Sequence, residues 1–150
     1  MIRLFSDLLE FKSQKPANAW GGPIEGNFYE WKISFYGPKD SDYENGLFNV
    51  KIIFPKDYPK SRPDCYFMHK DLYHPNIKQE GLVCLGNDFW NENKTICNVI
   101  YQIYDLLKFP NFDDTWDFKI KATYLEDKNI YHLIVRDLVK KNAPIFPLFK

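Results

Sequence analysis

The chain opens with hydrophobic residues at helical spacing and then changes to a different pattern. An apolar stripe with steps of three and four predicts an N-terminal helix that ends before Pro16. The stripe comprises Leu4, Phe5, Leu8, Leu9 and Phe11. The following segment, residues 17–27, holds three glycines and a proline, which favours a loop.

From Tyr29 the hydrophobic period is two. Trp31, Ile33 and Phe35 alternate with polar residues, which predicts a half-buried strand. Asn45-Gly46 is a sequence typical of a hairpin turn and precedes a second alternating strand over residues 48–54. A shorter strand is expected over residues 65–68. Consecutive strands with short connections predict an antiparallel meander of three or four strands.

After residue 90 the period returns to that of a helix. One wide apolar face predicts a central, well-covered helix that ends before Pro110; it comprises Ile96, Val99, Ile100, Ile103 and Leu107. A short helix is expected over residues 118–125. A last amphipathic helix takes its apolar face from Ile130, Leu133, Ile134 and Leu138. A helix, a meander and further helices predict an α+β fold, with residues 1–150 as a single domain.

Charge and cysteine content narrow the function classes. Lys+Arg and Asp+Glu both number 20, so net charge gives no reason to expect a nucleic acid or a membrane as partner. No apolar run approaches the roughly 20 residues that cross a bilayer, and we expect that the N-terminus is not a signal peptide. Three cysteines without a CxxC pair or a histidine cluster argue against a metal site. They fit a reducing compartment, so we expect the cytoplasm or the nucleus.

The stretch from Tyr73 to Asp114 lies mostly between regular elements and carries the informative motif. Its segments Tyr73–Ile77 and Gly81–Leu85 resemble the signature of ubiquitin-conjugating enzymes, in which a His-Pro-Asn tripeptide precedes the active cysteine. Asn76 and Cys84 keep the family's separation of eight residues. The resemblance covers nearly the whole chain, through Phe54–Pro59, Trp90, Thr95–Ile96 and Pro110–Asp114.

This resemblance implies a transferase of the ubiquitin-like conjugation pathway with the family's α+β fold, a four-stranded meander included. Such an enzyme accepts ubiquitin or a ubiquitin-like modifier from an activating enzyme as a thioester on Cys84. It then passes the modifier to a substrate lysine or to a ligase. The implied partners are therefore the modifier, the activating enzyme, a ligase and protein substrates. No cofactor is expected, because ATP is used by the activating enzyme.

The resemblance also implies roles for individual residues of this chain. Cys84 is the expected nucleophile, since a thiol exchanges acyl groups far better than a hydroxyl. Asn76 has two open roles, as the donor to the oxyanion or as a brace for its loop. Asp114, with Asp113 as a rival, is expected to orient the acceptor lysine or to favour its loss of a proton. In the family, the histidine at His74 is structural, although a Cys–His dyad is the competing interpretation.

Leu85 and Asn111 are expected to shape the groove for the modifier's C-terminal tail. The loop between Cys84 and Trp90 is about two residues shorter than is common in the family, which puts the details of this groove in question. Thr115 stands where a proline is typical.

The ligase-facing positions depart from the family pattern as well. Lys60 replaces an exposed aromatic residue, and Glu92 and Asn93 replace apolar ones. Ligases usually bury apolar anchors at such points, so we expect the common partners to bind weakly. The first helix is also poor in cations, with only Arg3 and Lys12, where the family meets the activating enzyme through positive charge.

Two alternatives to a conjugating enzyme remain open. A non-catalytic variant of the same fold would act as a binding or scaffolding module, but such variants lack the cysteine. An unrelated cysteine hydrolase would need a base and an orienting acid, and the sequence identifies neither.

Overall fold

The computed structural model describes residues 1–69 and 71–145. An N-terminal helix, α1 (Ile2–Gln14), precedes four strands: β1 (Ala19–Ile24), β2 (Asn27–Tyr36), β3 (Leu47–Ile53) and β4 (Asp64–Phe67). The remaining elements are α2 (Ile96–Lys108), a 3-10 turn η1 (Phe112–Asp114), α3 (Phe118–Glu126) and α4 (Lys128–Asn142).

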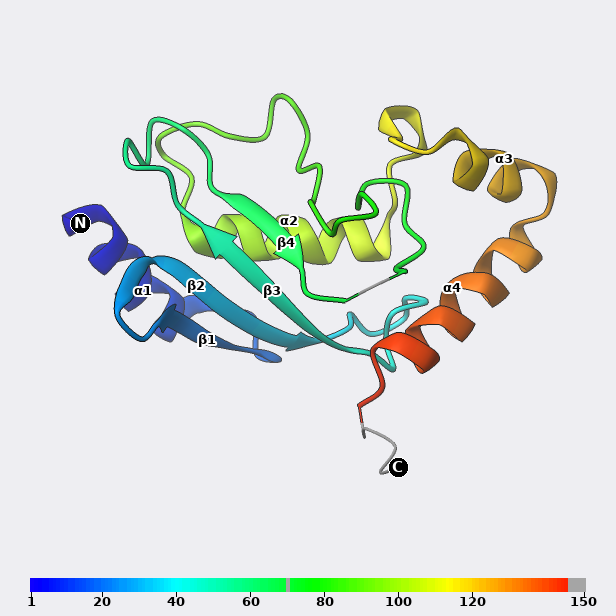
Figure 1. Cartoon of the computed structure of the whole chain (residues 1–150), viewed down its shortest axis with the longest axis horizontal. Helices are drawn as coiled ribbons and strands as arrows, with labels where there is room; N and C mark the ends of the chain where they lie inside the picture. The colour runs from blue at the N-terminus through cyan, green and yellow to red at the C-terminus, as the bar shows by residue number, and fades with distance from the viewer. Residues whose placement is uncertain (70, 146–150) are drawn as a thin grey trace.

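The four strands form one antiparallel sheet in the order β1-β2-β3-β4, with α2 lying across one face (Figure 1). The core lies between the sheet and the helices. The ring centroids of Phe35 on β2 and Tyr104 on α2 are 5.0 Å apart. Those of Trp31 on β2 and Phe11 on α1 are 6.5 Å apart, in an edge-to-face arrangement. The α+β fold with a four-stranded meander is therefore confirmed.

The prediction of a loop over residues 17–27 is wrong, because this segment contains the edge strand β1. Gly26, whose φ is 80°, lies in the turn between β1 and β2, whereas Gly21 is needed for close backbone approach. A Cβ on Gly21, whose φ is 131°, would lie 2.1 Å from the carbonyl oxygen of Lys32 on β2. Pro23 is tolerated because an edge strand leaves part of its backbone without a ladder partner.

The prediction of a hairpin turn at Asn45-Gly46 is also wrong, because these residues do not form a tight turn between two strands. Tyr36 pairs with Leu47, so residues 37–46 all belong to the connection between β2 and β3. Gly46 bridges to Pro144 beyond α4, and a Cβ there would lie 2.9 Å from the side chain of Val139. The ring of Phe48 would lie closer still, at 2.5 Å, so glycine is needed here for packing space against both β3 and the C-terminal helix.

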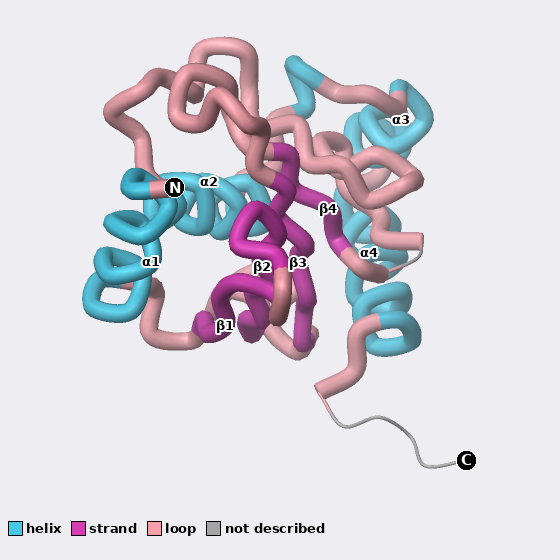
Figure 2. Tube along the Cα trace, turned by 60° about the vertical axis from the view of Figure 1, so that its left-hand side comes forward, coloured by secondary structure: helices cyan, strands magenta, loops and turns pink. Residues whose placement is uncertain are grey.

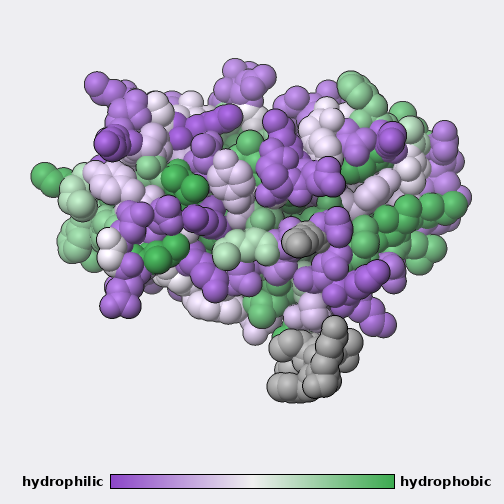
Figure 3. Space-filling model, viewed as in Figure 1, coloured by the Kyte–Doolittle hydropathy of each residue, from purple (hydrophilic) through white to green (hydrophobic). Residues whose placement is uncertain are grey.

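The apolar faces of the two terminal helices also differ from the prediction. On α4 the fully buried residues are Tyr131, Val135 and Val139, whereas Ile130 and Leu133 are 49% and 63% exposed. Figure 3 accordingly shows apolar surface on the side where α3 and α4 lie. On α1 the exposed residues include Phe5 and Leu9, and the third buried position beside Leu4 and Phe11 is Asp7.

The long irregular segments gather at one end of the sheet, above β4 and α2 (Figure 2). They include the stretch between β4 and α2 and the segment that connects α2 to α3. Because loops positioned by a rigid scaffold commonly carry function, this end is where a site is expected.

Candidate active site

Cys84 lies in the loop after β4, where backbone hydrogen bonds hold the cysteine and the residue before it. Its amide donates to the carbonyl oxygen of Asn76 at 2.8 Å, and the amide of Val83 donates to the carbonyl oxygen of Cys65 on β4 at 2.9 Å. The cysteine lines a cavity of about 410 Å³ between its own loop, α2 and residues 110–117, here called the facing loop. The sheet thus sets the position of Cys84, and the cavity leaves it open to a reactant.

The three cysteines have different environments. Cys65 and Cys97 are 1% and 4% exposed, and burial raises their pKa to about 12 and about 11. Cys84 is only partly buried. Its pKa is also raised, mainly by burial; nearby Lys78 lowers the pKa and Asp114 raises it. Cys84 is the thiol that a reactant in the cavity can reach.

Asn76 is 1% exposed, and its side-chain amide is fully engaged. Its Nδ2 group donates to the carbonyl oxygens of Asn111 and Asp114, at 2.9 Å each, and its Oδ1 accepts from the amide of Asn111 at 2.8 Å. These bonds join the cysteine's loop to the facing loop. An additional bond to an oxyanion would require one of the two donated bonds to open.

His74 is completely buried beneath this arrangement. Its Nδ1 accepts from the amide of Asn76 at 2.9 Å, so the ring is neutral and its Nε2–H donates to the carbonyl oxygen of Leu106 at 2.7 Å. Burial lowers its pKa to about 4. With both ring nitrogens bonded to backbone, His74 has no nitrogen available to Cys84, which agrees with a structural role.

The facing loop brings Asp114 to the mouth of the cavity. Asp114 and Asp113 are exposed in η1, and Asp114 lines the cavity together with Cys84. Thr115 and Trp116 attach the base of this loop, since the Thr115 hydroxyl donates to the carbonyl oxygen of Pro75 at 3.2 Å. The Trp116 indole donates to the carbonyl oxygen of His74 at 3.0 Å. Thr115, in the place of the family's proline, therefore contributes a bond of its own.

Leu85 and Asn111 both line the cavity, although Leu85 is only 3% exposed. Gln102 of α2 was not predicted as a site residue, yet its Nε2 donates to the carbonyl oxygen of Leu85 at 3.1 Å. This bond holds the backbone directly after Cys84. A polar residue on the border of an apolar helix face was the available signal, but it equally fits a solvated position.

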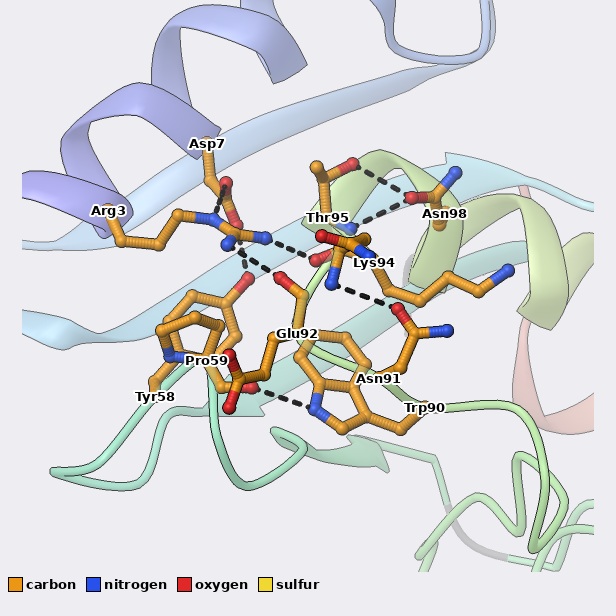
Figure 4. Close-up of polar contacts among 11 residues, drawn as sticks. Arg3, Asp7, Tyr58, Pro59, Trp90, Asn91, Glu92, Lys94, Thr95 and Asn98 are labelled. Carbon is orange, nitrogen blue, oxygen red and sulfur yellow. Dashed lines mark hydrogen bonds and ion pairs between the residues drawn. The ribbon is translucent and has the colours of Figure 1, made fainter.

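The residues predicted to face a ligase lie on two loops that the structure brings side by side. They are residues 57–62, here called the first partner loop, and residues 91–95, the second partner loop. Lys60, Glu92 and Asn93 are all exposed. The Trp90 indole donates to the carbonyl oxygen of Pro59 at 3.0 Å and connects the two loops (Figure 4).

A larger hollow of about 850 Å³ lies elsewhere, between the loop around Asp42 and α4. Asp42 closes part of its wall, since it accepts from Arg136 at 2.9 Å and lies 2.5 Å from His132. Cys84 and Asn76 are not among its described lining residues. Cavity size alone therefore does not identify the candidate site; the partly buried thiol of Cys84 distinguishes the smaller cavity.

The α+β fold places a partly buried cysteine beside a cavity, in a braced loop above the sheet. In a comparison with protein families, the model of the ubiquitin-conjugating enzyme family matches residues 3–139. The chain therefore belongs to the ubiquitin-conjugating enzyme family. Membership implies, in general terms, a ubiquitin-like modifier, an activating enzyme and a ligase as partners.

No helix within residues 1–69 and 71–145 is both long and apolar enough to span a membrane. Over the same ranges, no three side chains of His, Cys, Asp or Glu are grouped so that they could hold a metal ion.

Proposed function

We propose that this chain is a catalytically active ubiquitin-conjugating enzyme that carries ubiquitin or a ubiquitin-like modifier as a thioester on Cys84. The observation that supports this most is the contrast between the thiols. Cys84 lines an open cavity beside Asp114, whereas Cys65 and Cys97 are buried in the core. A scaffolding variant would have no use for a reachable thiol at this position.

In the first step, the Cys84 thiolate attacks the carbonyl carbon of the modifier's C-terminal thioester on the activating enzyme. The new C–S bond forms as the activating enzyme's thiolate leaves. In the second step, a lysine amine attacks the Cys84 thioester. The tetrahedral intermediate collapses to an amide, the Cys84 thiolate departs, and the amine's proton passes to a base or to water.

The raised pKa of Cys84 fits a carrier better than a constantly reactive nucleophile. Because the thiolate is the reactive form, a raised pKa keeps the resting thiol mostly protonated and protected from side reactions. The thiolate fraction rises with pH toward the thiol pKa, so the charging rate is expected to rise from neutral to mildly alkaline pH.

Asp114 is proposed to receive the acceptor lysine at the cavity mouth. A lysine amine with an ordinary pKa of about 10.4 is mostly protonated at neutral pH, so a carboxylate can hold it and favour loss of its proton. Asn76 also contacts Asp114, because its Nδ2 donates a hydrogen bond to the carbonyl oxygen of Asp114 at 2.9 Å. In this proposal Asn76 braces the facing loop and thereby sets where Asp114 stands.

The test is charging with modifier, activating enzyme and ATP. We expect Cys84→Ser to trap an oxyester that thiol reagents do not release, whereas Cys65→Ser and Cys97→Ser still form a thiol-sensitive adduct. Charging of Cys84→Ala at the wild-type level would overturn the assignment. A folded wild-type chain that no modifier in a panel charges would favour the scaffolding alternative.

A further inference from the structure

Arg3, one of two cations on α1, is turned toward the molecule instead of toward solvent. Its Nε donates to the Asp7 carboxylate at 2.9 Å, and its Nη1 donates to the carbonyl oxygen of Glu92 at 2.8 Å (Figure 4). Its Nη2 donates to the carbonyl oxygen of Lys94. One guanidinium therefore joins the first turn of α1 to two backbone positions of the second partner loop.

Asp7 extends this contact to the first partner loop. Its side chain is 2% exposed, and its second carboxylate oxygen accepts a hydrogen bond from the Tyr58 hydroxyl. Burial and the Asp7 carboxylate together raise the pKa of Tyr58, so the hydroxyl remains a donor. A buried carboxylate requires such partners, because an unpaired charge away from water is costly.

Aromatic contacts complete the junction. The Arg3 guanidinium lies over the Tyr58 ring, 5.5 Å from its centroid, and the Tyr58 and Trp90 ring centroids are 5.6 Å apart. We call Arg3, Asp7 and Tyr58, with the carbonyls of Glu92 and Lys94, the Arg3 clasp. It connects α1 and both partner loops, which lie far apart in the sequence.

We propose that Arg3 is a positioning residue for ligase recognition, which holds the second partner loop against α1 so that the ligase meets a preformed surface. The choice of a ligase as the partner rests on the proposed function. The bracing of the second partner loop by Arg3 does not. Because the Arg3 side chain is engaged within the molecule, Lys12 is the cation of α1 that can pair with an acidic group of a partner.

The side chains presented by these loops explain why rigidity matters. Lys60, Glu92 and Asn93 are polar, and polar contacts depend on distance and angle far more than apolar contacts do. Ordering a mobile loop on binding lowers affinity, and a loop fixed beforehand avoids that loss. A chain with polar residues at its partner loops therefore gains more from the Arg3 clasp than one with apolar anchors would.

Three variants separate positioning from simple charge. Arg3→Ala removes the clasp. Arg3→Lys keeps the cation and can still pair with Asp7, but one ammonium cannot replace the spread donors that reach both carbonyls. Lys12→Ala is the matched control, because it removes the other cation of the same helix and leaves the clasp intact.

The first measurement is amide hydrogen exchange at residues 93–95, which needs no partner. In the wild type these amides are held by local bonds, such as that from Lys94 to the carbonyl oxygen of Asn91 at 3.0 Å. We expect at least tenfold faster exchange there in Arg3→Ala and Arg3→Lys, and no change in Lys12→Ala. Unchanged exchange in both Arg3 variants would overturn the inference.

The second measurement is NMR titration of the uncharged, isotopically labelled chain with a panel of RING domains, including some with acidic grooves. We expect affinity to fall about tenfold, or about 1.4 kcal/mol, in both Arg3 variants and less than twofold in Lys12→Ala. Wild-type affinity in Arg3→Lys, or a larger loss in Lys12→Ala, would show that charge decides and would overturn the positioning role. Absence of binding across the whole panel would overturn the ligase as partner.

These outcomes are distinct from failure of the proposed function. The titration uses the uncharged chain, so it does not depend on a thioester. If the wild type binds a RING domain through the clasped loops but never charges, the thioester proposal fails, whereas the bracing of the second partner loop by Arg3 stands.

Discussion

The cavity around Cys84 and the surface of the partner loops are braced by different kinds of groups. At the cavity, the neutral side chains of His74 and Asn76 bond to backbone atoms and keep two loops together. At the partner loops, an ion pair between Arg3 and Asp7 does the corresponding work. The supports of the cavity therefore consist of neutral side chains, whereas the support of the partner loops depends on an ion pair.

Acid should weaken the cavity region through His74. The native pKa of about 4 lies below the ordinary 6.5, so the unfolded chain binds the proton more readily. Stability is therefore lost as pH falls from about 6.5 to about 4, by up to about 3 kcal/mol, with no further loss from this group below that range. Urea unfolding across this pH range measures it. An NMR titration that placed the His74 pKa near 6.5 would contradict the buried, neutral brace.

Replacing Asn76 should show what the neutral brace contributes to the reaction. We expect Asn76→Ala to charge nearly normally but to discharge to free lysine about a hundredfold more slowly, whether the amide serves the oxyanion or holds Asp114 in place. The measurement is single-turnover discharge beside a thermal unfolding curve.

The matched control for Asn76 is Trp116→Phe, which loosens the base of the facing loop but keeps the amide. Slower discharge in both variants supports bracing. Slower discharge in Asn76→Ala alone, at an unchanged melting temperature, supports the oxyanion role.

Asp114→Asn should separate thiol reactivity from acceptor handling. Removing its charge takes away one of the influences that raise the pKa of Cys84, so alkylation of the thiol at neutral pH should become faster. Discharge to lysine should nevertheless become about tenfold slower or more, because the carboxylate that meets the amine is gone. Asp113→Asn is the control for a nearby exposed acid. Equal discharge rates in wild type and Asp114→Asn would remove Asp114 from the mechanism.

The smallest effect is expected at Lys60. An exposed lysine in place of an aromatic anchor should make ordinary RING domains poor activators, and Lys60→Phe should improve their stimulation of discharge a few-fold. The rate with and without each RING domain is the measurement. Strong stimulation of the wild type, unchanged in Lys60→Phe, would show that the polar partner loops do not limit recognition.

The parts of the fold with a clear period could be predicted from the sequence. The alternation through Trp31, Ile33 and Phe35 and the apolar face of α2 identified a strand and a helix, and all three strand residues are fully buried. β1 could not be identified in this way, because the glycine that permits close strand pairing at Gly21 has the same local signature as a loop.

Side-chain partners were harder to predict than elements. The sequence does not indicate that Asp7 on α1 is buried, because its hydrogen-bond donor Tyr58 lies 51 positions away. Asn76 could be singled out from its motif, but its two possible roles could not be separated until its bonds to Asn111 and Asp114 were visible. Such long-range polar pairings depend on the tertiary fold, and local spacing carries no record of them.

Both braces share one property with a consequence for how this protein can change over time. The Asn76 side chain binds the facing loop through the amide and carbonyl of Asn111 and the carbonyl of Asp114. The Arg3 side chain binds the second partner loop through the carbonyls of Glu92 and Lys94. Main-chain atoms are the same whatever the side chain. Mutations that alter the outward side chains of either loop therefore keep the hydrogen bonds that hold its backbone. Evolution can then change which acceptors and ligases are bound without changing the backbone of these loops.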